Sequence, residues 1–368
     1  MRIQSILLSL LALAAVSCKP SEQVGRKTVP LVREIISDKD SPYNVLVSGR
    51  TANPSDDICI IGSEAACGVV ADAMLSVDRR DNVDGKVFSD GLLDFSGETV
   101  CCIIDSASPD YPGNISRHED VSVREGAVRL ALSAIDTTYH LSPYDLSGRG
   151  GKVPAKVIVL TDPHLIQYSA FDIDTLFRAT GCGIPVISSL DVMFDEVFEA
   201  ASGRSVNVGV LCDSANVHSA SYNSIFNAAM HRNGARNSGC VVIPARSDGK
   251  GTMLDFLDDF IGTGIELPLD FIVVDSYSVD IDEMKADLAS AVSVMNEESM
   301  TYGKLISEEF AFVEPAASVS RRCYDLLRRE NLFTHNISKP QAVFYYSSAK
   351  PGADDNSIIL ISGNYVQN

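Results

Sequence analysis

The chain has 368 residues with a formal net charge of −19, and 45% of its residues are hydrophobic. This length exceeds what one hydrophobic core usually supports, so we expect two domains or lobes, and the hydrophobic content excludes a disordered stalk. So acidic a surface repels phosphate backbones and anionic lipid headgroups, and we therefore expect no binding of nucleic acid.

Residues 1–17 have the parts of a secretory signal, namely Arg2, an apolar run over 6–16 and small residues before Cys18. The apolar run is too short to span a bilayer, which needs about 20 apolar residues. The segment Ala15-Val16-Ser17-Cys18 resembles the lipobox of bacterial lipoproteins, with Ala15 in place of the usual leucine. This resemblance implies an acylated Cys18 (palmitate or a similar chain) at the mature N-terminus, a polar tether over residues 18–28, and contact with a membrane through the lipid alone. It places the protein in the cell envelope, at the outer membrane if the source is Gram-negative. The alternative is an ordinary signal peptide that contains a cysteine.

Beyond the tether, short apolar runs alternate with amphipathic stretches. The runs are rich in Val, Ile and Cys and alternate little with polar residues, which is typical of parallel strands covered on both faces. This pattern predicts an α/β fold of two doubly wound parallel-sheet lobes, each a three-layer αβα arrangement. The expected strands are Asn44–Val47, Asp57–Ile61, Thr99–Ile104, Lys156–Leu160, Pro185–Ile187, Val206–Leu211, Gly239–Ile243 and Phe271–Val274. The expected helices are Glu64–Leu75, Val123–Asp136, Ile173–Ala179, Val192–Ala200, Ser219–Arg232, Met253–Phe260, Asp282–Met295 and Ala317–Arg329.

The Gly/Ser segment over residues 201–205 follows a helix and precedes a strand, which indicates a boundary between lobes and a hinge. We therefore expect an N-terminal α/β lobe over 29–203 and a C-terminal α/β lobe over 204–368. The last apolar runs, Ala342–Tyr346 and Ser357–Ile361, are separated by a turn-rich loop. They predict a C-terminal hairpin on a sheet edge.

Two α/β lobes behind an export signal resemble the type 1 periplasmic binding proteins. The local stretches that carry this resemblance are Ile60-Ile61-Gly62-Ser63-Glu64-Ala65 and Val208-Gly209-Val210-Leu211-Cys212-Asp213. The first is similar to a strand–Gly–helix turn of one lobe, and the second to the first strand of the other lobe. The resemblance implies a lipid-anchored protein that binds a small polar ligand between its lobes without catalysis. The ligand would be an amino acid, a sugar or a nucleoside, and the partner a transporter or sensor.

In an open parallel sheet, ligands bind beyond the carboxyl ends of the strands. Short hydroxyl and carboxylate side chains recur at these ends, where they also serve as helix caps. Arg246 is suited to a carboxylate of the ligand, and Tyr277 to stacking on a ring or sugar. The predicted ligand-binding residues are Ser63, Ser106, Asp162, Asp213, Arg246, Asp275 and Tyr277.

The alternative functions are an exported enzyme and a structural lipoprotein. We find neither the G-x-S-x-G motif of esterases nor a complete phosphate-binding loop, and we expect no metal and no cofactor. If the protein is a hydrolase or isomerase, Asp162 and His164 are the candidates for acid–base catalysis. Two-lobed racemases of the aspartate/glutamate kind place a cysteine thiol on each lip of a cleft, and Cys182 with Cys67 is the candidate pair here. The cysteines other than Cys18 fall mostly in apolar runs, so we expect mostly free, buried thiols.

Overall fold

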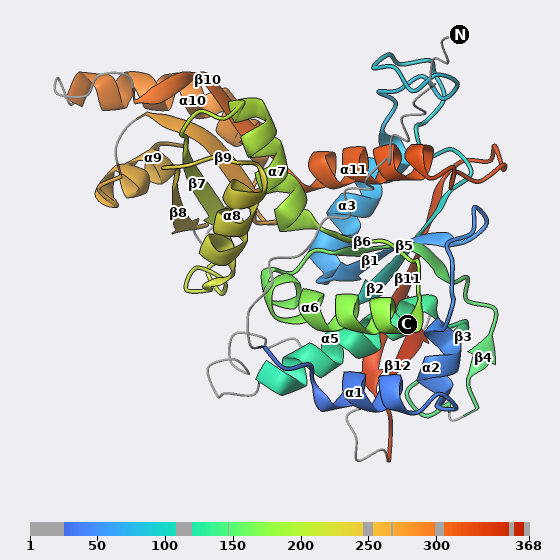
Figure 1. Ribbon diagram of the computed structural model, residues 1–368. Coiled ribbons are helices and arrows are strands. Elements are labelled where there is room, and N and C mark those ends of the chain that lie inside the picture. The colour runs from blue at the N-terminus through green and yellow to red at the C-terminus, as the bar shows by residue number, and fades with distance from the viewer. Residues whose placement is uncertain are drawn as a thin grey trace, which may run out of the picture.

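The computed structural model describes residues 26–107, 120–145, 147–245, 253–265, 268–298, 305–352 and 357–363. Cys18, most of its tether and Arg246 lie outside the described residues. The described strands form a six-stranded sheet, a four-stranded sheet and a small two-stranded ribbon, and helices cover both faces of the two large sheets (Figure 1). The predicted α/β fold of two doubly wound lobes is confirmed.

The first sheet has the strand order β12-β11-β2-β1-β5-β6. All neighbours in it are parallel except β11 and β12, which pair antiparallel. Its strands are β1 (Asp57–Gly62), β2 (Thr99–Ile104), β5 (Ala155–Leu160), β6 (Val186–Ser188), β11 (Gln341–Ala349) and β12 (Ile358–Ser362). The ribbon beside it consists of β3 (Thr138–Tyr139) and β4 (Arg149–Gly150).

The central strands of this sheet are mostly apolar because both of their faces are covered. Every residue of β1 and β5 is buried. In β2, Cys101 faces one hydrophobic core and Cys102 the other, as expected for successive residues of a strand. All eight described cysteines are free, and six of them are buried, which confirms the expectation of free thiols.

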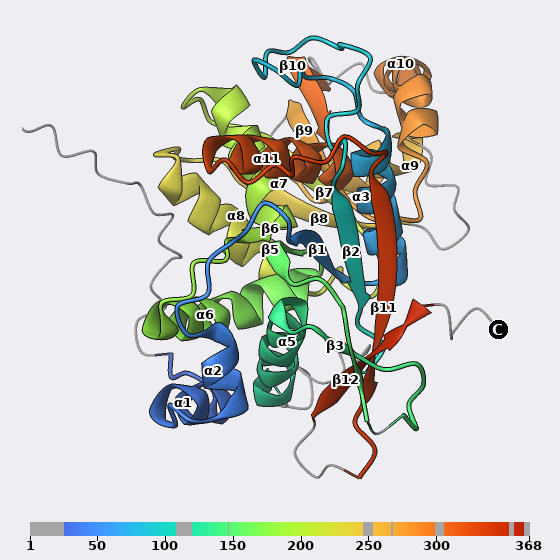
Figure 2. The ribbon, with the colours of Figure 1, turned by 90° about the vertical axis from the view of Figure 1, so that its right-hand side faces the viewer.

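Helices α3 (Glu64–Ser76) and α11 (Pro315–Arg329) lie side by side over one face of the first sheet (Figure 1). The other face is covered by α5 (Asp120–Ile135) and α6 (Pro163–Thr180), with α1 (Pro30–Ser37) and α2 (Pro42–Val47) packed outside them (Figure 2). No helix in the described parts of the chain is both long and apolar enough to cross a membrane.

The second sheet is entirely parallel and has the order β10-β9-β7-β8. Its strands are β7 (Asn207–Cys212), β8 (Gly239–Pro244), β9 (Leu269–Asp275) and β10 (Ile306–Val313). Helices α7 (Ser189–Ala201) and α8 (Ser221–Arg232) cover one face, and α9 (Met253–Gly262) and α10 (Ile281–Glu298) the other. One hydrophobic core runs without interruption from α6 of the first lobe to α7 and α8, so the lobes share packing as well as chain connections.

The division of the chain into lobes differs from the expected boundaries. The C-terminal strands β11 and β12 do pair as a hairpin, but β11 also pairs with β2, so the expected lobe over 204–368 is wrong in its last part. The chain also leaves the first sheet earlier than residues 201–205. Helix α7 already packs on α8, with the Phe194 and Phe226 rings 5.4 Å apart. The connections between the lobes therefore lie at β6–α7 and at β10–α11.

Two local predictions differ from the structure. Asn44–Val47 is helical, because Pro42 sits in the first turn and Ser41 Oγ accepts the Asn44 N–H at 3.1 Å. The edge strand β10 was not expected, because its half-exposed sequence contains two consecutive glutamates, Glu308 and Glu309.

A buried ion pair fastens the returning C-terminal segment to the first sheet. Lys156 Nζ lies 2.6 Å from Glu98 Oε2, and both side chains are almost fully buried. The ammonium also donates to the carbonyl oxygens of Pro54 at 2.9 Å and Leu332 at 3.0 Å. Glu98 Oε1 accepts the N–H of Thr334 at 2.8 Å. A buried charge pair is stable only with such additional hydrogen bonds.

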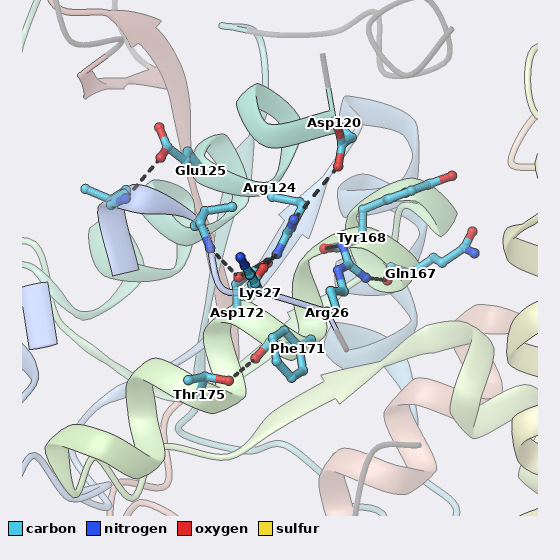
Figure 3. A network of polar contacts seen from close by, with 12 residues as sticks. Arg26, Lys27, Asp120, Arg124, Glu125, Gln167, Tyr168, Phe171, Asp172 and Thr175 are labelled. Carbon is cyan, nitrogen blue, oxygen red and sulfur yellow. Dashed lines mark hydrogen bonds and ion pairs between the residues drawn. The ribbon is translucent and has the colours of Figure 1, made fainter. Parts of the chain in front are cut away.

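The N-terminal residues of the body are fastened to α5 and α6 by a second buried pair (Figure 3). Arg124 Nε donates to Asp172 Oδ2 at 2.7 Å, and Arg124 Nη2 donates to the Lys27 carbonyl at 2.7 Å. Asp172 Oδ1 also accepts the Val29 N–H at 3.0 Å. Residues 27–29 thus complete the hydrogen bonding of two buried charges and fasten the chain to α6. Asp162 is the N-cap of α6, and His164 lies in its first turn.

Candidate functional site

The carboxyl ends of β1, β2 and β5 are neighbours at one edge of the first sheet. Ser63, which follows β1, caps α3 by accepting the Ala66 N–H at 3.2 Å, and its side chain is exposed. Asp162, which follows β5, caps α6. Its Oδ1 accepts the N–H groups of His164 at 2.8 Å and Leu165 at 3.0 Å, and the side chain is half-buried.

The loop after β2 is organised by Ser347 of β11. The Ser347 hydroxyl donates to Asp105 Oδ1 at 2.7 Å, and its oxygen accepts the N–H groups of Ser106 and Ala107, each at 3.0 Å. Ser106 Oγ donates to the Ser347 carbonyl. Sequence reasoning missed Ser347, because β11 was expected in the other lobe.

The carboxyl ends of β7 and β9 form the corresponding edge of the second sheet. Asp275 is the last residue of β9 and is 2% exposed. Tyr222, a fully buried residue of α8, donates its hydroxyl to Asp275 Oδ2 at 2.7 Å. Asp213 follows β7, and its Oδ1 accepts a hydrogen bond from Ser276 Oγ at 2.6 Å. Tyr222 was not singled out in the sequence, where a tyrosine early in a helix looks like any other core residue.

The two edges meet each other across the boundary between the lobes. His164 Nδ1 of the first lobe lies 3.4 Å from Ser219 Oγ of the second lobe. Tyr277 of the second lobe packs against the core of the first lobe, close enough to Cys67 for the two side chains to interact electrostatically. We call this boundary, bordered by Asp162, His164, Asp213, Asp275 and Tyr277, the seam.

The surroundings of Asp275 disfavour the charged form of its carboxyl group. Burial raises its pKa well above the ordinary value, the hydrogen bond from Tyr222 lowers it, and the negative charges of Asp162 and Asp213 raise it again. Its Oδ1 is buried without a hydrogen-bond partner among the described residues. Because Oδ2 accepts from Tyr222, Oδ1 is the oxygen that is left for a hydrogen bond with a ligand.

Opposing influences also act on the pKa of Asp162. Burial raises its pKa, but the charge of His164 and the N–H groups of Leu165 and His164 lower it, and Asp105 raises it. Burial lowers the pKa of His164, against the opposing effects of Asp162 and of a hydrogen bond with Asn216. The carboxyl groups of Asp162 and Asp275, one from each lobe, thus lie in different environments at the seam.

The structure thus brings together four of the seven predicted ligand-binding residues, Asp162, Asp213, Asp275 and Tyr277, at the seam. Ser63 and Ser106 lie at the same edge of the first sheet but are exposed and engaged in local hydrogen bonds. Arg246 lies outside the described residues. Among those residues, no group of three or more His, Cys, Asp or Glu side chains is arranged to hold a metal ion.

The candidate thiol pair is not formed. Cys182 precedes β6, at the opposite edge of the sheet, where the Gly183 N–H donates to the Arg50 carbonyl at 2.7 Å. Arg50 lines a surface hollow of about 460 Å³ at that edge, remote from the seam. Cys67 is fully buried, with its sulfur 3.8 Å from the Ile60 carbonyl.

Comparison with known proteins shows a shared fold. No family model matches the chain, and no curated protein is a significant match. A glutamate racemase from Francisella tularensis in complex with D-glutamate is 13% identical, with a TM-score of 0.50 over 80% of this chain and 88% of that one. A glutamate racemase isoform from Bacillus anthracis is 11% identical, with a TM-score of 0.50 over 83% of this chain and 92% of that one. The two-lobed α/β architecture is therefore the architecture of glutamate racemases.

Proposed function

We propose that the protein is an enzyme that moves a proton on a small polar metabolite held at the seam, an isomerase- or racemase-type reaction. The observation that carries this proposal is the Asp162–Asp275 pair. The two carboxyl groups come from opposite lobes, and the charge of one raises the pKa of the other. This favours catalysis over binding without chemistry, because neither capping nor packing requires a buried carboxyl oxygen that has no hydrogen-bond partner among the described residues.

The proposed reaction uses the two carboxyl groups in different roles. The Asp162 carboxylate takes a proton from a C–H bond of the ligand that is acidified by a neighbouring carbonyl or carboxyl group. The carboxylic acid of Asp275 delivers its own proton from Oδ1 to the opposite face of the same carbon. One C–H bond breaks and one forms, so the product is an isomer and Asp162 ends protonated. Acid–base pairs of this kind contribute about 10²–10⁴-fold each to a rate.

The shared fold supports this proposal. The similar structures are glutamate racemases, one of them bound to D-glutamate, so this architecture accommodates a small ligand. Racemases of the aspartate/glutamate kind use paired thiols, whereas the groups that meet at the seam here are carboxyls. A carboxylic acid needs no reducing environment, which fits an exported protein better than a thiol pair does.

Deuterium wash-in tests the proposal whichever isomer is the product. The purified protein is incubated in D₂O with amino acids, hydroxy acids and sugar acids, and carbon-bound deuterium is followed by NMR. We expect exchange with one class of compound. Asp162→Asn and Asp275→Asn should abolish it while the protein stays folded, because asparagine also caps α6 and also accepts from Tyr222.

The control variant is Asp174→Asn, on the exposed face of α6, where Asp174 pairs with Arg178 at 2.8 Å. It should exchange deuterium at the wild-type rate. Ligand binding without any exchange, or full exchange in both seam variants, would contradict the acid–base role.

We also propose that the mature protein is lipid-anchored through Cys18 in the cell envelope. The support is the signal-like N-terminus described above. Mass spectrometry of the protein from its native membrane should show an acylated N-terminal Cys18, and Cys18→Ala should remove the lipid while Cys182→Ser leaves it in place. An unmodified Cys18 in the membrane-derived protein would refute the anchor.

A further inference from the structure

Tyr277 is held by both lobes at the seam. Its backbone follows β9 of the second lobe, two residues beyond Asp275, whereas its ring packs against the hydrophobic core that α3 and α11 form with the first sheet. Val192 and Tyr277 are the only described hydrophobic side chains that the second lobe contributes to this core. The preceding residue, Ser276, is 2% exposed and donates its hydroxyl to Asp213 Oδ1 at 2.6 Å. The ring of Tyr277 is therefore fixed in one lobe and its backbone in the other.

The hydroxyl group of Tyr277 is buried, yet it has no hydrogen-bond partner among the described residues. Asp275 Oδ1, two residues earlier in the chain, is in the same situation. Native proteins usually give a buried polar atom a partner, as they do for a buried tyrosine hydroxyl. Tyr222 follows this rule, because it donates to Asp275 Oδ2 at 2.7 Å. The exception at Tyr277, beside a second unpaired atom, points to a hydrogen-bond partner from outside the chain, namely a ligand of the seam.

The chemistry of this hydroxyl is that of a hydrogen-bond donor. Burial raises the pKa of Tyr277 well above its ordinary value, and the side chains of Asp275, Cys67 and Asp162 raise it further. The phenol therefore keeps its proton at neutral pH and can donate it in a hydrogen bond. The ring is occupied by packing against the first lobe, so it is the hydroxyl rather than the predicted stacking face that is left for a ligand.

We infer that Tyr277 is a further catalytic residue, whose hydroxyl donates to the carbonyl or carboxyl oxygen beside the reacting carbon of the ligand. This inference rests on the proposed function. When Asp162 takes the proton, the electron pair of the broken C–H bond moves toward that oxygen, where negative charge builds up. When Asp275 delivers its proton to the carbon, the charge returns to form the new C–H bond, and Tyr277 keeps its own proton throughout. A donor that is already fixed in place stabilises such a charge without having to reorganise.

Thermal melting of tyrosine-to-phenylalanine variants separates this role from a structural one. Tyr277→Phe removes a hydroxyl that has no partner in the described protein, so its melting temperature should equal or exceed that of the wild type. Tyr222→Phe loses its hydrogen bond to Asp275 and should melt at a lower temperature. Tyr144→Phe is the matched control, because Tyr144 is 83% exposed, and it should melt like the wild type. A clear drop in the melting temperature of Tyr277→Phe would reveal a structural partner for the hydroxyl and overturn the inference.

Deuterium wash-in with the same variants tests the catalytic role, using the compound that exchanges with the wild type at increasing concentrations. Tyr277→Phe should lower kcat for exchange by about 10²–10³-fold, as expected for loss of one such donor, with a smaller change in KM. Tyr144→Phe should exchange at the wild-type rate. A kcat of Tyr277→Phe within a few-fold of the wild-type value would overturn this inference and leave the proposed function intact. Absence of exchange in the wild type would instead refute the proposed function, and this inference with it.

Discussion

The buried carboxyl group of Asp57 allows a direct prediction about stability. It opens β1 at the edge opposite the seam and is 6% exposed. Burial raises its pKa from 3.8 to about 7, despite the nearby charges of Lys152 and Lys156. The replacement Asp57→Asn keeps the shape of the side chain and removes the charge. We therefore expect the variant to be more stable than the wild type, by an amount that grows above the pH at which this carboxyl ionises in the unfolded chain.

The sign and size follow from proton linkage. Below about pH 4 the carboxyl is protonated in both folded and unfolded chains, and the variant gains nothing. Between pH 4 and pH 7 the unfolded chain loses its proton first, so the wild type loses stability as the pH rises. At 1.36 kcal/mol per pKa unit, the shift from 3.8 to about 7 amounts to about 4 kcal/mol of unfolding free energy above pH 7.

Urea unfolding of wild type and variant between pH 4 and pH 8 measures this difference. Asp174→Asn serves as a surface control, for which we expect a change of less than about 0.5 kcal/mol at any pH, as is usual for a helix ion pair. A difference between Asp57→Asn and the wild type that does not grow with pH would refute the reasoning.

Three further predictions concern packing and pairing. Lys156→Met should lower the free energy of unfolding by about 3–5 kcal/mol, since Glu98 stays buried and unpaired, and the double variant with Glu98→Gln should recover part of the loss in the same urea assay. Gly62→Ala should destabilise by about 1–3 kcal/mol, because the added Cβ would lie 1.9 Å from Thr161 Oγ1; a thermal melt equal to the wild type would contradict this contact. Tyr222→Phe should cost about 1–3 kcal/mol of stability and raise the pKa of Asp275 further, because its hydrogen bond to Asp275 lowers that pKa; unchanged melting and titration would contradict this pairing.

The sequence was informative wherever structure depends on local pattern. Fully buried runs such as Asp57–Ile61 identified the central strands, and parallel strands bring their carboxyl ends together. Asp162, Asp213 and Asp275 could therefore be placed at one boundary without the strand order. The expected capping role of Asp162 is also present, in the hydrogen bonds from α6.

The missed features depend on contacts between distant parts of the chain. No local pattern indicates that β11 returns to pair with β2, so Ser347 was not expected beside Asp105. Lys156 was expected simply within a strand, whereas its burial depends on Glu98 and on the Leu332 carbonyl, 176 residues away. The suggested pairing of Cys182 with Cys67 is wrong because it also depends on where distant segments lie in the sheet. Cys182 lies at the amino end of β6, whereas Cys67 lies beyond the carboxyl end of β1.

Titration of the Asp275 carboxyl carbon by ¹³C NMR, in the wild type and in Asp162→Asn, tests the central geometric claim most directly. We predict an apparent pKa well above the ordinary value for aspartate, and a lower one in Asp162→Asn, because the charge of Asp162 contributes to raising it. An Asp275 that titrates in the ordinary range, or whose pKa is the same in both proteins, would show that the two carboxyl groups do not share a seam.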